Sequence, residues 1–229
     1  MWGSFDDGNA FNRYTNLDGA EWRIIYALAA SKTKHAKNLW RMLKYNTSDC
    51  LIRDDSDVDP ENPNYIANRL ALVYVDTGVS DNKKVFLSPY IDDAWVTQSA
   101  RLDVFVDSIR PTNNINSQVN IGIEIIVHNK INNIDGDASS TDPNSNPSEL
   151  RDGESIIPYK SRATTMLKSV LAELNGVFID GVGMLQHNMG INSDSKTTSK
   201  VWNNRAYFGF SVIMTTYING VSVNSGDSW

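Results

Sequence analysis

Two stretches of alternating apolar residues in the middle of the chain constrain its fold most. In residues 101–109 three aliphatic side chains occupy alternate positions, and in residues 119–127 five do so. A period of two places these side chains on one face of a strand. The polar residues 111–118 separate the two stretches, so the sequence predicts an antiparallel hairpin with a buried face.

Helical spacing appears on both sides of this hairpin. The first predicted helix begins at Asp18, which with Glu21 resembles a capping box, and runs to Ala29. A second helix is predicted over residues 35–45, with Leu39, Trp40, Met42 and Leu43 as its apolar stripe and with Lys37, Arg41 and Lys44 facing water. Further helices are predicted over residues 65–72 and 161–174, the last ending at the pair Asn175-Gly176.

Strand patterns complete the sheet. Residues 85–91 predict a short edge segment, and residues 205–218 predict a long strand that is apolar on both faces. Residues 188–204 are polar and are interpreted as a loop. The predicted fold class is α+β: a mainly antiparallel sheet packed by helices, with N-terminal helices and long loop insertions.

The chain divides into three parts by composition. Residues 1–17 form a polar and aromatic N-terminal arm, residues 18–220 a single α+β domain, and residues 221–229 a C-terminal tail. Residues 130–158 are rich in Asn, Asp, Ser and Pro, and we interpret them as a loop inserted at the end of the sheet. An apolar fraction of 41% over 229 residues suffices for one core.

Charge and cysteine content limit the function. A net charge of −6 gives no reason to expect nucleic-acid binding through a basic face. The single cysteine, Cys50, excludes a disulfide within the chain and a cysteine-based zinc site. The sequence shows neither a signal peptide nor an apolar run long enough for a membrane span, so we expect a soluble protein made in a cytoplasm.

Motifs with a chemical role are incomplete. Residues 55–59 alternate Asp as a calcium loop does, but Pro60 stands where the loop needs Gly and Ile66 where it needs Glu. We therefore interpret this segment as a solvated acidic loop. His35, His128 and His187 are far apart, and no catalytic or nucleotide-binding motif is present, so the sequence predicts no cofactor, no metal and no enzymatic activity.

A family resemblance rests on the order of parts. Residues 38–45 read NLWRMLKY, and residues 85–93 read VFLSPYIDD. After them come the hairpin, a helix ending in Leu174-Asn175-Gly176, the bend Gly181-Val182-Gly183 and the strand 208–212. Over residues 20–220 this order resembles the neck and tail-completion proteins of tailed bacteriophages. These proteins form head–tail connector, stopper and tail-terminator rings. Among them, the sequence most resembles those of crAss-like phages.

The resemblance implies a structural virion protein without a cofactor. It implies a homo-oligomeric ring of six or twelve copies in the neck, assembled in the host cytoplasm and joining the portal to the tail. The expected partners are other neck, portal and tail proteins. Packaged DNA would pass through the lumen without specific binding, and no membrane is involved.

Aromatic and loop residues are the predicted interface. We expect Trp2 and Phe5 of the arm, the inserted loop between Asp135 and Asn146, and Trp229 of the tail to contact neighbouring proteins.

Two other classes of function stay open at this point. In a carbohydrate-binding or adhesion module, exposed aromatic side chains such as Trp95, Trp202 and Tyr207 would stack on sugar. In an enzyme with a cryptic site, His128 and Glu124 would meet an Asp or His187 in a pocket.

Overall fold

The computed structural model describes residues 19–54, 56–74, 83–88, 99–112, 116–135, 159–187, 195–202 and 206–219. Its helices are α2 (Ala20–Ala30), α3 (Lys34–Lys44), α4 (Tyr65–Leu70) and α5 (Arg162–Leu174), with short 3-10 turns η1 (Ser48–Leu51) and η3 (Asn129–Ile131). Its strands are β1 (Val85–Phe86), β2 (Ala100–Pro111), β3 (Asn116–His128), β4 (Asn133–Asp135), β5 (Tyr159–Ser161), β6 (Val177–Ile179), β7 (Gly183–Leu185), β8 (Lys196–Trp202) and β9 (Tyr207–Asn219).

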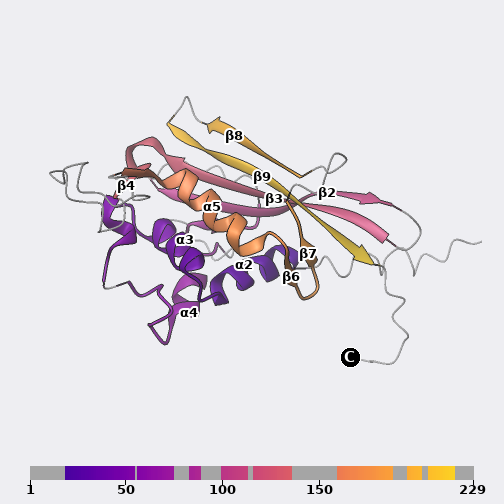
Figure 1. Cartoon of the computed structure of the whole chain (residues 1–229), viewed down its shortest axis with the longest axis horizontal. Coiled ribbons are helices and arrows are strands. Elements are labelled where there is room, and N and C mark those ends of the chain that lie inside the picture. Colours follow the sequence, from indigo (N-terminus) through magenta and orange to yellow (C-terminus); the bar gives the residue numbers. More distant parts are fainter. Residues whose placement is uncertain are drawn as a thin grey trace, which may run out of the picture.

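One five-stranded sheet organises the fold. Its strand order is β1-β2-β3-β9-β8, and every pair is antiparallel except β1 with β2. Helices α2, α3 and α5 lie together on one face of this sheet (Figure 1). The predicted α+β class, with a mainly antiparallel sheet packed by helices, is confirmed. No described helix is long and apolar enough to cross a membrane.

The core lies between the helices and one face of the sheet. The alternating residues of β3, from Val119 to Val127, are fully buried on this face. Trp40 of α3 and Val170 of α5 are fully buried in the same cluster. The Trp40 indole N–H donates to the Leu28 carbonyl at 2.9 Å, so this large side chain is buried without an orphaned donor.

The central hairpin and the last helix form where the sequence predicts them. Strands β2 and β3 pair from Ala100↔Val127 onward, with a bulge between Val106 and Ser108. The Ser161 hydroxyl caps α5 by accepting from the Thr164 amide at 3.4 Å. After α5, Gly176 adopts a φ of 77°, which a residue without a Cβ takes at little cost.

The start of the first helix differs from the prediction. The N-cap of α2 is Gly19 and has no side-chain cap hydrogen bond. The Glu21 carboxylate, predicted to close a capping box, instead accepts from the Val106 amide of β2 at 3.3 Å. Glu21 thus forms a tertiary contact with the sheet and not the local hydrogen bond of a capping box.

Two segments predicted as loops contain strands. Residues 196–202 form β8, whose side chains are almost all exposed and therefore show no apolar alternation. At the two ends of the predicted insertion, β4 pairs with β5 as a short ribbon. The rest of that insertion, the arm and the tail lie outside the described residues, and with them Trp2, Phe5, Asn146 and Trp229.

Candidate functional site

Two buried arginines close the ends of two helices. Arg162, fully buried, donates to the carbonyls of Met42, Tyr45 and Thr47 at 2.7, 2.5 and 2.8 Å, where α3 ends. It also donates to the Ile131 carbonyl at 2.8 Å. The last carbonyls of a helix have no partner within the helix, and this guanidinium supplies them with donors.

Arg69 does the same for α2. It donates to the carbonyls of Ala29 and Ser31 at 2.8 and 2.7 Å and to that of Val58 at 2.7 Å. Burial lowers the pKa of Arg69 to about 10, so the side chain stays charged at neutral pH. The guanidinium lies over the Tyr65 ring, 4.8 Å from its centroid.

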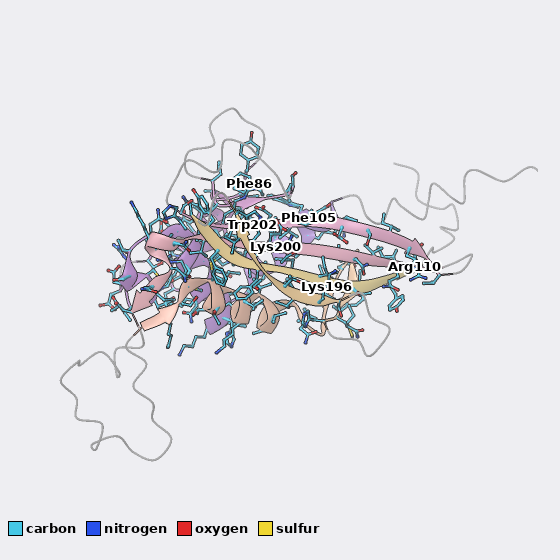
Figure 2. All side chains as sticks on the ribbon, turned by 90° about the horizontal axis from the view of Figure 1, so that it is seen from above. Phe86, Phe105, Arg110, Lys196, Lys200 and Trp202 are labelled. Atoms are coloured by element: carbon cyan, nitrogen blue, oxygen red, sulfur yellow. The ribbon has the colours of Figure 1, made fainter. Side chains whose placement is uncertain are left out.

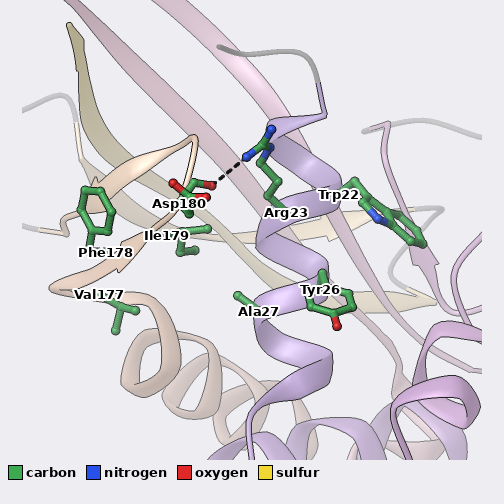
Figure 3. Close-up of a pocket in the computed structure, with 8 residues that line it drawn as sticks. All are labelled: Trp22, Arg23, Tyr26, Ala27, Val177, Phe178, Ile179 and Asp180. Carbon is green, nitrogen blue, oxygen red and sulfur yellow. Dashed lines mark hydrogen bonds between the residues drawn. The ribbon is translucent and has the colours of Figure 1, made fainter. Parts of the chain in front are cut away.

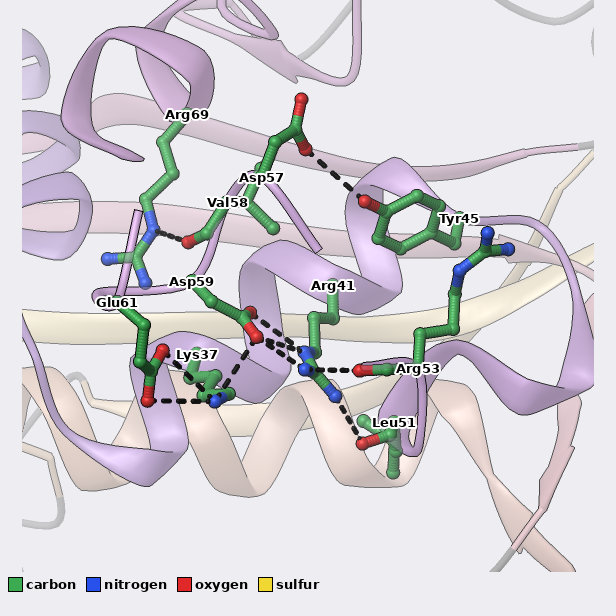
Figure 4. Close-up of polar contacts among 10 residues, drawn as sticks. All are labelled: Lys37, Arg41, Tyr45, Leu51, Arg53, Asp57, Val58, Asp59, Glu61 and Arg69. Carbon is green, nitrogen blue, oxygen red and sulfur yellow. Dashed lines mark hydrogen bonds and ion pairs between the residues drawn. The ribbon is translucent and has the colours of Figure 1, made fainter. Parts of the chain in front are cut away.

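The acidic loop, residues 56–61, is bound to α3 (Figure 4). Arg41 donates to Asp59 at 2.8 Å, Lys37 lies 3.1 Å from Asp59 and 3.2 Å from Glu61, and Lys44 pairs with Asp57. The predictions that Arg41 faces water and that this loop is merely solvated are therefore wrong.

Charge pairing sets the ionisation of this loop. Burial alone would raise the pKa of Asp59, but hydrogen bonds from Arg41 and Lys37 outweigh it and hold the pKa below its ordinary value. Among the described residues, which exclude Asp55, no group of His, Cys, Asp and Glu could hold a metal ion. We name α3, the acidic loop, Arg69 and Arg162 together the α3 flank.

The outer face of the sheet, opposite the helices, carries a pair of carboxylates. Asp103 of β2 stands directly across from Glu124 of β3. Arg101 donates to Asp103, and Lys200 of β8 donates to Glu124 at 2.5 Å. Figure 2 views this face and shows Lys200 and Lys196 along β8.

Solvent does not reach Asp103. Its exposed fraction is 0%, and its Oδ2 atom has no hydrogen-bond partner in the part of the chain that the structure describes. Burial raises the pKa of Asp103 to about 7; Arg101 opposes the rise and Glu124 adds to it. A carboxyl whose pKa lies near neutrality can take part in acid–base chemistry, but a substrate would have to reach Asp103, and its side chain is fully buried.

The predicted cryptic site is only partly assembled. Glu124 does meet an Asp, but His128 lies four positions along β3, about 13 Å at ~3.3 Å per residue. His187 hydrogen-bonds Thr197 at 2.8 Å, which pairs with Val212 of β9. His128 pairs with Tyr207, about 17 Å from Val212 along the strand, so the two histidines are far apart.

The aromatic residues named in the carbohydrate-binding hypothesis do not form an exposed surface among the described residues. Tyr207 is 5% exposed and packs edge-on against His128, with ring centroids 5.0 Å apart. It is therefore not the exposed aromatic residue that the hypothesis requires. Trp202 is half-buried beside it, and Trp95 lies outside the described residues.

Strand β8 is the last strand of the sheet among the described residues. It pairs with β9 on one side and ends the sheet order on the other, and its side chains from Lys196 to Val201 are exposed. Beyond Asp103, β2 has no paired strand on its outer side among the described residues. Its exposed side chains there include Asp107 and Ile109.

An apolar groove runs between α2 and the β6–β7 hairpin (Figure 3). We name it the α2 groove; its volume is about 520 Å³. Its lining residues are Trp22, Arg23, Tyr26, Ala27, Val177, Phe178, Ile179 and Asp180.

Hydrogen bonds fix the walls of the α2 groove. Gln186 and Thr215 exchange backbone hydrogen bonds at 2.9 Å, and the Thr216 hydroxyl donates to the Val182 carbonyl at 3.0 Å, so the hairpin is fixed on β9. Arg23 donates to the Asp180 carbonyl at 3.2 Å and ties α2 to the hairpin.

The predicted interface residues and the surfaces found differ. Asp135 is half-buried and accepts from the Ser48 hydroxyl at 2.9 Å, which joins β4 to η1. No sequence pattern predicted the α2 groove. Its signal was the position of Trp22 and Tyr26, four residues apart and outside the stripe of Ile24, Ile25, Leu28 and Ala29.

These observations define an α+β protein whose sheet is covered by helices on one face. The family model of YomW matches residues 36–216, from α3 to β9, and the chain belongs to the YomW family. The family is phage-derived, named for a protein of a Bacillus phage region, and the chain is a phage-associated protein. No curated protein and no solved structure matches the chain significantly.

Proposed function

We propose that the protein is a structural component of a tailed-phage virion that forms a ring in the neck. In this role it joins the portal and head to the tail, as a head–tail connector or tail terminator, and acts by contact without catalysis. Membership of a phage-derived family supports the phage part of the proposal. The surfaces of the subunit support the ring.

The exposed edge strand β8 carries the proposal. An uncovered edge offers its backbone N–H and C=O groups to another chain, and proteins commonly protect such edges with lysine. Lys196 and Lys200 occupy this edge. The lysines on this edge disfavour pairing with strands that are uncharged or positively charged. A partner with negative charge can still pair with the backbone of β8.

The charge on β8 favours a head-to-tail contact. Antiparallel pairing of β8 with the β8 of a second copy would bring Lys196 and Lys200 opposite or diagonal to the same lysines, and like charges destabilise cross-strand pairs. At the β2 edge lie Asp107 of β2 and the carboxylate of Glu21 of α2, which accepts from the Val106 amide, while Arg110 is exposed at the far end of the strand. A contact between two different surfaces generates a ring when its rotation closes.

The experiment is mass photometry of the protein alone and mixed with portal complexes from the same phage. The proposal predicts a closed ring, formed either alone or on the portal, and its weakening by Lys196→Glu. Lys168→Glu, on the exposed side of α5, is the matched control with the same charge reversal. A protein that remains monomeric in the presence of portal would contradict the proposal.

A further inference from the structure

We infer that the α2 groove receives the N-terminal arm, residues 1–17, of a neighbouring copy. This inference deepens the proposed function and rests on it, since it names what one subunit of the ring gives to the next. The groove supplies an apolar cleft with one charged end, and the arm supplies aromatic and acidic side chains.

The α2 groove gathers exposed apolar surface in one place. Phe178 is 68% exposed, Tyr26 48%, and Trp22 and Val177 38% each. Met184, the cross-strand neighbour of Phe178, is also exposed. Single exposed hydrophobic residues are ordinary, but a contiguous set around a cleft is typical of a contact site. The described residues leave this set uncovered.

The arm has the matching chemistry. It carries Trp2, Phe5, Phe11 and Tyr14, and Asp6 and Asp7 directly follow Phe5. Aromatic side chains that fill pockets dominate the energetics of interfaces. Arg23 and Asp180 both line the groove, and Arg23 donates to the Asp180 carbonyl. The guanidinium of Arg23 has further N–H donors, which would attract the two carboxylates of the arm.

The geometry of the chain favours a neighbouring copy as the donor. The arm joins the fold at Gly19, the N-cap of α2, and α2 is itself one wall of the groove. To fill its own groove, the arm would have to reverse at Gly19 and run back along α2. Extended, the 17 residues of the arm would reach about 60 Å, enough to cross to the next subunit. Each copy then donates one arm and receives one.

Disulfide cross-linking of full-length variants tests the inference. Phe5→Cys and Phe178→Cys are made in separate chains carrying different tags, mixed under assembly conditions and oxidised. Phe178 is exposed, so its substitution leaves the core intact. Cys50 is buried, and burial raises the pKa of its thiol, so it does not compete. Ile52→Cys, on an exposed residue away from the groove, replaces Phe178→Cys in the control mixture.

The expected result is a covalent dimer of the two tagged chains, at least about ten-fold more abundant than with Ile52→Cys. A second variant, Phe178→Ser, should weaken arm-dependent association about thirty-fold, the usual effect of removing an aromatic anchor. A mixed dimer no more abundant than with Ile52→Cys would overturn the inference. A variant that carries both cysteines in one chain completes the test: cross-linking only within that chain would also overturn it, as would disulfide-linked dimers formed by Phe178→Cys alone.

Mass photometry of the reduced mixture separates this inference from the ring proposal. Rings without the mixed cross-link would leave the neck function standing and reject the arm as the occupant. A mixed cross-link in dimers that never close into rings, even on portal, would support the arm contact and reject the ring.

Discussion

The α3 flank and the α2 groove belong to neighbouring helices but differ in how they treat their side chains. On the α3 flank, Arg41 and Asp59 are paired while buried, and Arg162 bonds the carbonyls at the end of α3. At the α2 groove, Tyr26 and Phe178 are left exposed. One surface is closed by contacts within the chain and the other keeps apolar area uncovered.

We infer from this difference that the α3 flank stabilises the subunit and that the α2 groove serves in its association with other chains. A buried charge is costly unless it is paired, so the buried contacts of the α3 flank are the ones on which the stability of the fold depends. Exposed aromatic side chains contribute little to the stability of the single subunit. Substitutions of the buried charged residues of the α3 flank should therefore destabilise the fold, and substitutions in the α2 groove should leave the protein folded but change its association.

The largest expected effect is that of Arg162→Met. This variant keeps most of the side-chain volume but leaves four carbonyls without a donor, and it should lower the free energy of unfolding by about 4 kcal/mol. Urea denaturation measures the loss. Lys168→Met, on the exposed side of the same helix, is the control. A loss below about 1 kcal/mol would show that the carbonyls find other partners.

Asp59→Asn should follow, because it leaves Arg41 buried beside a neutral amide. We expect a loss of about 3 kcal/mol in the free energy of unfolding. The matched variant is Asp57→Asn, whose pair with Lys44 is exposed: the Asp57 side chain is 41% exposed, and such pairs contribute about 0–1 kcal/mol. Equal losses in the two variants would remove the distinction between buried and exposed pairs.

Asp103 should make stability depend on pH. Its folded pKa of about 7 lies above the ordinary value, so the folded state binds this proton more tightly than the unfolded chain does. The resulting stability is fully present below pH about 4 and is lost as the pH rises through about 7.

Asp103→Asn isolates this contribution. Relative to this variant, the wild-type protein should lose about 2 kcal/mol between pH 5 and pH 8, measured by urea denaturation at each pH. Parallel curves, or a relative gain by the wild-type protein, would show that Asp103 is ionised throughout this range.

The smallest expected effect on stability is that of Phe178→Ser. Since the side chain is mostly exposed, the free energy of unfolding should change by less than about 0.5 kcal/mol. Leu174→Ala, at the buried end of α5 next to the same hairpin, should cost about 2–5 kcal/mol. A large loss in Phe178→Ser would mean that the groove is part of the core and not a contact surface.

Sequence patterns predicted the parts of the fold that repeat with a regular period. The hairpin β2–β3 and the helix α5 have one buried face each, and their alternation or helical spacing is visible in the residues. Strand β8 was missed because it reads Lys-Thr-Thr-Ser-Lys, with both faces polar and exposed. A strand without a buried face has no apolar period to detect.

The contacts that close the α3 flank could not be read from the sequence. Lys37 and Arg41 have the spacing of a solvated helix face, and only the fold brings Asp59 against them. The α2 groove had a partial signal in the sequence. Trp22 and Tyr26 lie within the helix predicted from Asp18 to Ala29, but the sequence does not show which side chains of that helix the sheet covers. Of the predicted interface residues, the structure describes only Asp135, which makes a contact within the chain.

The most direct test compares backbone hydrogen–deuterium exchange in the free protein and in the protein assembled with portal. We expect new protection in residues 22–27 and 177–180 of the α2 groove and along β8, with no change in the α3 flank. Protection that changes on the α3 flank while the α2 groove and β8 stay as they were would contradict this expectation.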